Sequence, residues 1–177
     1  MAYVQYPFEK TTCVQLPDEF IIAGKVWRIG RYFTAIPATT GYATVHFHTP
    51  AGKITLYQLK EVNKTGGEFL YTMVEGGTYA GGTAYGAPFN LRRANKDSAV
   101  LLTSMQYGIS PTATITGGTA SPPRGLPGTS QGSQRTAGGI AGDFMELLPD
   151  TDYTLKLDNI GTVSGNGNIL IDLVVAV

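Results

Sequence analysis

The sequence contains a single cysteine, Cys13, among its 177 residues. An intrachain disulfide therefore cannot form, which is typical of proteins that fold in a reducing cytosol. A chain of this length buries about 70% of the surface that its unfolded form exposes, so it needs neither a disulfide nor a metal to build a hydrophobic core. The length predicts one domain.

Long apolar runs are missing as well. The most apolar stretch, residues 169–177, is interrupted by Asp172, and it is far shorter than the ~18 residues that a membrane-spanning helix needs. The first residues, MAYVQYPFEKTT, lack the positively charged start and apolar centre of a secretion signal. We therefore expect neither a membrane partner nor a secretory route.

The sequence has no excess of charge of either sign, with 13 basic and 13 acidic residues. Proteins that bind nucleic acid usually carry a basic patch that neutralises several phosphates. The nearest approach to such a patch is Arg92-Arg93 with Lys96, which Asp97 flanks. We interpret this segment as a solvated loop and expect no nucleic-acid partner.

Glycine is abundant instead, at 23 residues, which is roughly twice the ~7% share of average proteins. The glycines punctuate short runs in which apolar and polar residues alternate, as Ala43, Val45 and Phe47 do. This period of two indicates β-strands joined by turns, and many such strands predict an all-β sandwich or barrel. The predicted strands are residues 25–29, 31–36, 42–49, 53–62, 69–74, 99–107, 111–116, 151–157 and 168–177.

Two segments depart from this pattern. Residues 1–24 contain Pro7, Pro17 and scattered aromatic side chains, and two interpretations stay open: an extended arm that lies on a partner, or an edge strand with its lead-in. Residues 25–177 are the predicted sandwich domain. Within it, residues 117–142 have few large apolar side chains, so we expect a flexible loop that cannot bury enough surface to offset the entropy of ordering.

The two histidines, His46 and His48, share one face of a predicted strand because side chains two positions apart point the same way. A metal site would need further ligands, but there is no other histidine and Cys13 is distant in the sequence. We therefore predict no metal and no cofactor. The hypothesis that remains is that protonation of these histidines near pH 6.5 tunes an interface.

Catalytic constellations are also absent from the sequence pattern. Glycoside hydrolysis needs two carboxyl groups about 5–10 Å apart, and no spacing singles out a pair among Glu61, Glu75, Asp143 and Glu146. No serine occupies a nucleophile elbow, and no helix follows the glycine pairs as phosphate binding requires. We predict that the protein is not an enzyme, and leave open carbohydrate binding through Trp27, Tyr79 or Tyr85.

From residue 70 onward, short motifs follow one another in a recognisable order. The first half has Leu70-Tyr71 with Glu75, Gly82-Thr83, Asn90 with Arg93, and Pro111-Thr112 before Gly117-Gly118-Thr119. The second half has Glu146, Leu148, Pro149, Thr151 and Tyr153, followed by Asp158-Asn159. In this order the motifs resemble the head decoration proteins of tailed bacteriophages, over residues 24–177. Leu91 and the Val-Val-Ala-Val ending depart from the pattern of that family.

The resemblance implies a jelly-roll antiparallel β-sandwich and a structural role in the virion. The expected function is that of a capsid decoration, or cement, protein that binds the outer surface of the head and stabilises contacts between coat subunits. Its expected partner is the major capsid protein or another virion protein, and its expected form is a homotrimer. The expected location is the capsid surface of a particle assembled in the host cytoplasm. The alternative is a head or tail fibre module that binds a receptor or glycan.

The resemblance also gives structural roles to four motif residues. Glu75 would accept hydrogen bonds at the end of a strand, and Arg93 would bridge carbonyls or a carboxylate across the sandwich. Tyr153 would return its hydroxyl group to the backbone at a corner, as in other β-sandwiches. Asn90 belongs to the same set, as the partner of Arg93 in the motif.

Overall fold

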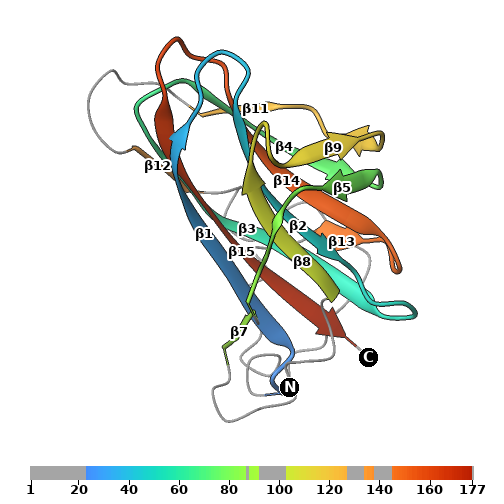
Figure 1. Cartoon of the computed structure of the whole chain (residues 1–177). Coiled ribbons are helices and arrows are strands. Elements are labelled where there is room, and N and C mark those ends of the chain that lie inside the picture. Colours follow the sequence, from blue (N-terminus) through green and yellow to red (C-terminus); the bar gives the residue numbers. More distant parts are fainter. Residues whose placement is uncertain (1–22, 87, 92–102, 127–133, 138–144, 177) are drawn as a thin grey trace.

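The computed structural model describes residues 23–86, 88–91, 103–126, 134–137 and 145–176. Within these residues every element of regular secondary structure is a β-strand. Two antiparallel sheets pack face to face, and a two-stranded ribbon is the third sheet (Figure 1). The prediction of an all-β antiparallel sandwich is confirmed. In the part of the chain that is described, no helix is long and apolar enough to cross a membrane.

The first sheet is built on three long strands in the order β3–β15–β1, and shorter strands extend both of its edges. β12 and β13 pair with β3 at different places, and β7 pairs with β1. The strands are β1 (Val26–Ile36), β3 (Ile54–Thr65), β7 (Phe89–Asn90), β12 (Gln134–Ala137), β13 (Met145–Leu147) and β15 (Gly165–Ala176).

The second sheet has the order β10–β4–β14–β2–β8–β6, and β11 also pairs with β4. Its strands are β2 (Tyr42–His48), β4 (Phe69–Glu75), β6 (Thr83–Ala84), β8 (Thr103–Ile109), β10 (Thr119–Ala120), β11 (Arg124–Leu126) and β14 (Asp152–Asn159). The ribbon consists of β5 (Thr78–Ala80) and β9 (Thr114–Thr116).

The core lies between the two sheets, and the sequence alternation decides which side chains enter it. On β2, Ala43, Val45 and Phe47 are completely buried in the core, while His46 and His48 point to the opposite face. Phe47 stacks on Tyr153 of β14 with ring centroids 5.9 Å apart. The first sheet contributes the inward-facing side chains Ile29, Phe33, Ile169, Ile171 and Leu173.

The two strands predicted for residues 25–29 and 31–36 are one continuous strand, β1. Gly30 suggested a break, but it lies within the strand, where an added Cβ would approach the Leu170 side chain to 2.7 Å. A larger residue at position 30 would have to displace the end of the Leu170 side chain, so Gly30 allows close packing within the strand and does not mark a turn. The irregularity comes later, as a bulge between Phe33 and Ile36 at which Ala35 has a φ of 55°.

The segment 117–142 was predicted to be a loop without secondary structure, but its described parts contain three short strands. β10 and β11 pair with β4, whereas β12 pairs with β3, so this segment contributes to both sheets. Leu126 at the end of β11 is buried in the core. The predicted strand 111–116 is shorter than expected, because it begins at Thr114. Residues 99–102, and the proposed N-terminal arm as far as residue 22, lie outside the described residues.

Candidate functional site

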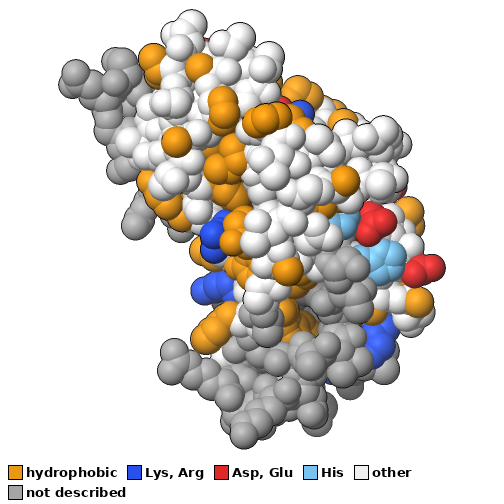
Figure 2. Space-filling model, in the orientation of Figure 1, with side chains coloured by type: hydrophobic (Ala, Val, Ile, Leu, Met, Phe, Trp, Pro, Cys, Tyr) orange, Lys and Arg blue, Asp and Glu red, His pale blue; other side chains and the backbone are white. Residues whose placement is uncertain are grey.

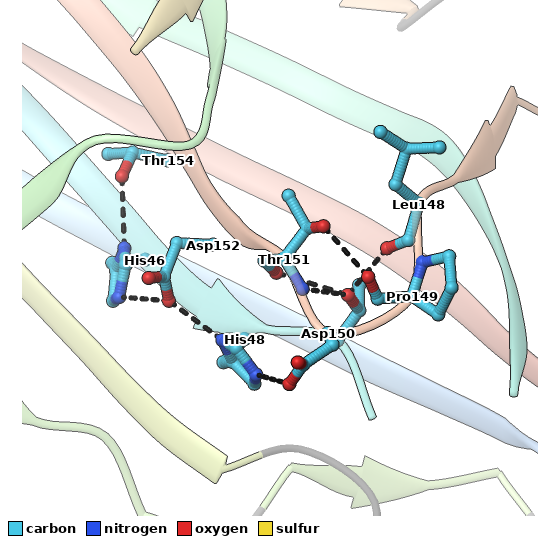
Figure 3. Close-up of polar contacts among 9 residues, drawn as sticks. His46, His48, Leu148, Pro149, Asp150, Thr151, Asp152 and Thr154 are labelled. Carbon is cyan, nitrogen blue, oxygen red and sulfur yellow. Dashed lines mark hydrogen bonds and ion pairs between the residues drawn. The ribbon is translucent and has the colours of Figure 1, made fainter. Parts of the chain in front are cut away.

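Among the described residues, a group of four titratable side chains lies on the outward face of the second sheet, where β2 ends and β14 begins. It comprises His46 and His48 from β2, Asp152 from β14, and Asp150 from the turn that precedes β14 (Figure 3). The antiparallel register places Asp152 opposite His48 and Thr154 opposite His46. We call these four ionisable residues the His–Asp cluster.

His48 contacts a carboxylate with each of its two ring nitrogens. Its Nδ1 lies 3.0 Å from Oδ1 of Asp152, and its Nε2 lies 3.1 Å from Oδ1 of Asp150. His48 is partly exposed, and Asp150 is largely exposed. Figure 2 shows the pale-blue histidine atoms next to red carboxylates at the surface of the molecule.

His46 is buried and has different neighbours. Its Nδ1 lies 3.0 Å from the Thr154 hydroxyl oxygen, and its Nε2 lies 3.5 Å from Oδ1 of Asp152. Tyr79 of β5 stacks on the imidazole with ring centroids 4.6 Å apart and an interplanar angle of 4°. The Tyr79 hydroxyl is hydrogen-bonded to Thr44, at 2.8 Å. The ribbon therefore covers His46 and is attached to β2 by the same tyrosine.

The turn that carries Asp150 is fixed by Thr49, the residue that follows β2. The Thr49 hydroxyl donates to the Leu148 carbonyl at 2.7 Å, and its oxygen accepts from the Thr151 amide at 3.0 Å. The Thr49 amide donates to the Thr151 carbonyl at 2.9 Å. Asp150 itself has a φ of 51°, a left-handed conformation that asparagine and aspartate adopt more readily than most residues do.

The two histidines have pKa values shifted in opposite directions. Burial lowers the pKa of His46, and the nearby His48 lowers it further, although the charge of Asp152 opposes both. For His48, burial alone would lower the pKa, but hydrogen bonds and charge attraction from Asp152 and Asp150 outweigh burial and raise it. Neighbouring histidines on one strand thus favour different charge states.

The contacts among Thr154, His46 and Asp152 are those of a nucleophile, base and orienting acid, but their setting excludes this chemistry. Thr154 is buried, and the Tyr79 ring lies over the imidazole. A substrate could not approach the hydroxyl as nucleophilic catalysis requires. In the described part of the chain, no group of three or more His, Cys, Asp or Glu residues is arranged to hold a metal ion.

The motif residues Tyr153 and Glu75 meet at the corner between β13 and β14. The Tyr153 hydroxyl accepts a hydrogen bond from the Leu148 amide at 2.8 Å and donates one to Oε2 of Glu75 at 2.9 Å. The expected return of the tyrosine hydroxyl to the backbone is therefore present. Among the described residues, the Glu75 carboxylate has this hydroxyl as its hydrogen-bond partner. Burial raises the pKa of Tyr153 to about 12, and hydrogen bonding to Glu75 adds to the effect.

The other two motif residues can be placed only in part. Asn90 lies on β7, where its backbone pairs with Trp27 of the first sheet, and Arg93 lies outside the described residues. The forked arginine–carboxylate pair that the structure contains is Arg28 and Asp172, with N–O distances of 2.7 and 2.9 Å. Sequence reasoning missed this pair because only the register of β1 and β15 places the two residues opposite each other.

The aromatic residues considered for carbohydrate binding are engaged in internal contacts. Trp27 is buried, and the ring and hydroxyl of Tyr79 are held by His46 and Thr44. The Tyr85 hydroxyl accepts from the Gly30 amide at 3.1 Å and donates to the Gly30 carbonyl at 2.5 Å. Tyr85, whose amide donates to the Met105 carbonyl of β8, therefore joins the second sheet to β1. None of the three presents a free ring of the kind that stacks on sugars.

Of the four carboxylates considered for glycoside hydrolysis, the structure describes the side chains of two, and these lie in different sheets. Glu75 is engaged by Tyr153 in the second sheet, and Glu146 is exposed on β13 of the first sheet. Asp143 and the side chain of Glu61 lie outside the described part of the structure.

The fold defines the chain as an antiparallel β-sandwich, and comparison with known proteins adds no further assignment. No protein-family model, no curated protein and no solved structure matches the chain.

Proposed function

We propose that this protein is a capsid decoration protein of a tailed bacteriophage, which binds the outer surface of the head and stabilises contacts between coat subunits. The proposal is supported first by the order of the sequence motifs between residues 70 and 159. The observation that carries it furthest is the way in which the strands pair along the chain, because this pairing favours a jelly roll.

A jelly roll has eight strands that pair in a nested order. The first strand pairs with the eighth, the second with the seventh, the third with the sixth, and the fourth with the fifth. Here β1 pairs with β15, β2 with β14, β3 with β12 and β13, and β4 with β11. This nested order is what wrapping a long antiparallel ribbon into two sheets produces. In this interpretation β8 and β6 are an addition at the β2 edge of the second sheet.

The surface supports a role in binding neighbours. Among the exposed large apolar side chains, two pairs lie near turns: Ile54 and Leu148 are 52% and 57% exposed, and Ile160 and Val163 are 44% and 58% exposed. The others are Tyr32, Phe89 and Met145. Thr55 of β3 pairs with Leu147 of β13, and both of these side chains are buried. Because side chains alternate along a strand, the adjacent residues Ile54 and Leu148 point to the opposite, outward side. Isolated apolar residues are common on surfaces, but a pair next to the turn fixed by Thr49 is suited to a rigid contact.

The proposed mechanism uses binding energy instead of chemistry. A protein that binds the assembled shell and not its separated subunits stabilises the shell, by about 2.7 kcal/mol per site when its free concentration is one hundred times the Kd. Contacts repeated over one lattice add together. A closed ring of three identical copies would let small interfaces reinforce one another.

The test compares phage particles that carry the protein with particles stripped of it. We expect stripped particles to release their DNA at a lower temperature, and purified protein to restore the native temperature when it is added back. The variant I54S/L148S should restore less, whereas I160S/V163S serves as a control with a comparable loss of exposed apolar surface. Equal heat resistance of stripped and decorated particles would contradict the proposal.

The alternative, a receptor- or glycan-binding fibre module, makes a different prediction. The isolated protein would then bind bacterial cells or purified surface glycans in a saturable manner. The internal contacts of Trp27, Tyr79 and Tyr85 favour the decoration role over this one. Cell binding without any effect on shell stability would favour the fibre module.

A further inference from the structure

The contacts of His48 require a particular protonation state. A neutral imidazole has one N–H group and one lone pair, and an ionised carboxylate offers acceptors alone. Both nitrogens of His48 lie within 3.1 Å of carboxylate oxygens, from Asp152 and Asp150. Both contacts are hydrogen bonds when the ring carries two protons, and one of them becomes a repulsive contact between lone pairs when a proton is lost.

His46 satisfies its contacts in the neutral state. Its Nε2–H group points at Asp152, and its Nδ1 can accept a hydrogen bond from the Thr154 hydroxyl, which has a proton to give. The stacked Tyr79 ring and the surrounding burial disfavour a charge at this position. The arrangement therefore pairs a neutral histidine with a charged one, and both share the same oxygen of Asp152.

We propose that His48, Asp150 and Asp152 form a proton-dependent clasp, which fixes the turn between β13 and β14 to the end of β2. The turn consists of residues 148–151 and includes the exposed Leu148 (Figure 3). Protonated His48 holds the turn through Asp150 and the start of β14 through Asp152. When His48 loses its proton, one contact is lost, and the hydrogen bonds made by Thr49 are left to hold the turn.

The groups that face the clasp are few in the described residues. His46 lies on the same strand, Asp152 on β14 and Asp150 in the turn, and the uncharged Tyr79 of β5 lies over His46. On the β8 side, Gln106 pairs with His46 and Thr103 pairs with His48, and both of these residues are uncharged. The carboxylates are thus the charged partners of His48, and a change in its protonation is not compensated by another cation among these groups.

The direction of the pH effect follows from the raised pKa of His48. A group whose pKa is higher in the folded state than its ordinary value of 6.5 contributes stability fully below pH 6.5. That contribution is lost as the pH rises through the folded-state pKa. The clasp is therefore closed in mildly acidic solution and loosens above pH 6.5. His46 has the opposite effect on stability, because its pKa is lowered in the folded state. As the pH falls below 6.5, the unfolded chain binds a proton at His46 more readily than the folded protein does, and the folded protein loses stability.

The first test is an NMR titration of both histidines in the isolated full-length protein. We expect a midpoint above 6.5 for His48 and below 6.5 for His46. The variant D150N should lower the His48 midpoint. It should leave the His46 midpoint nearly unchanged, because Asp150 contacts His48 and not His46. Asparagine is chosen since it tolerates the left-handed backbone at this position. D158N removes a charge from the same face of β14, beside Lys156, and should change neither midpoint.

The second test asks whether the proton controls the turn. Hydrogen exchange of the Thr151 amide, expressed as a protection factor relative to the Ile171 amide in the central strand β15, should fall as the pH rises past the His48 midpoint. The protection factor can fall by at most about tenfold for each unit by which the pKa of His48 in the closed clasp exceeds its pKa in the open clasp. In H48Q the protection factor should not depend on pH over this range.

Two results would overturn the proposal. One is a His48 midpoint at or below 6.5 in the native protein, which would mean that the carboxylates do not hold a proton on the ring. The other is a raised midpoint with Thr151 protection that does not follow it, which would mean that the proton is bound without fixing the turn. These measurements use the isolated chain, so their outcome does not depend on whether the protein binds a phage head.

Discussion

At the scale of single residues, Tyr153 is the side chain on which the corner between β13 and β14 depends. It is completely buried, its ring stacks on Phe47, and its hydroxyl joins the Leu148 amide to Glu75. The ring therefore fills the core while the hydroxyl satisfies one backbone donor and one carboxylate. A single residue thus links packing between the sheets to the position of the turn.

Removal of this hydroxyl is expected to destabilise the fold. Y153F keeps the ring but removes one hydrogen bond to the Leu148 amide and one to the charged Glu75 carboxylate, and the loss of these two bonds should cost about 1–3 kcal/mol. E75Q keeps an acceptor for the hydroxyl and should cost less than about 1 kcal/mol. Urea unfolding measures both changes. A loss in Y153F no larger than that in E75Q would show that the corner does not depend on the hydroxyl.

Sequence reasoning identified some of these residues but not their partners. Tyr153 was singled out as a corner tyrosine, and His46 and His48 were placed on one face because their spacing on a strand requires it. Asp150 and Asp152 were not foreseen, since they lie 102 and 104 residues from His48 in the chain. Only the register of β2 and β14 brings them together, and a single sequence carries no direct record of strand register.

At the scale of elements, the β5–β9 ribbon is a lid on the outward face of the second sheet. Its exposed side is rich in threonine, with Thr78, Thr114 and Thr116 facing solvent. Its inner side presents Tyr79, which stacks on His46 and contacts Thr44. The ribbon explains why a histidine on the outer face of a sheet is as buried as a core residue.

This cover should control the acidity of His46. Because burial lowers the pKa of His46, Y79A should expose the imidazole and raise its pKa toward 6.5. Y79F keeps the stacked ring, loses the hydrogen bond to Thr44, and should leave the pKa of His46 close to that of the native protein. Histidine NMR titration distinguishes the two variants. Equal midpoints in Y79A and the native protein would mean that the ribbon does not set the environment of His46.

The strands differ in how well their sequences predicted them. Residues 42–49 and 69–74 alternate cleanly, and they form β2 and β4 with bounds within one residue of those expected. The short strands β10 to β12 were missed because their side chains are mostly small or polar, and backbone pairing with β4 and β3 holds them in place. Such edge strands depend on a neighbour that is already folded, so local pattern does not reveal them.

At the scale of the whole molecule, the class of fold follows from the sequence, and the strand order does not. Alternation and glycine-rich turns predicted a sandwich, but the pairing of the first long strand with the last could not be read from local periodicity. That pairing now carries the jelly-roll interpretation, and with it the proposed place of the protein on a phage head.

A cryo-EM map of the parent particle tests the central claim most directly. We expect density for the sandwich on the outer surface of the head, repeated with the symmetry of the coat lattice and in contact with more than one coat subunit. The end that carries Ile54 and Leu148 should face the shell. Density for this protein on the tail alone, or a head without it, would contradict the proposed function.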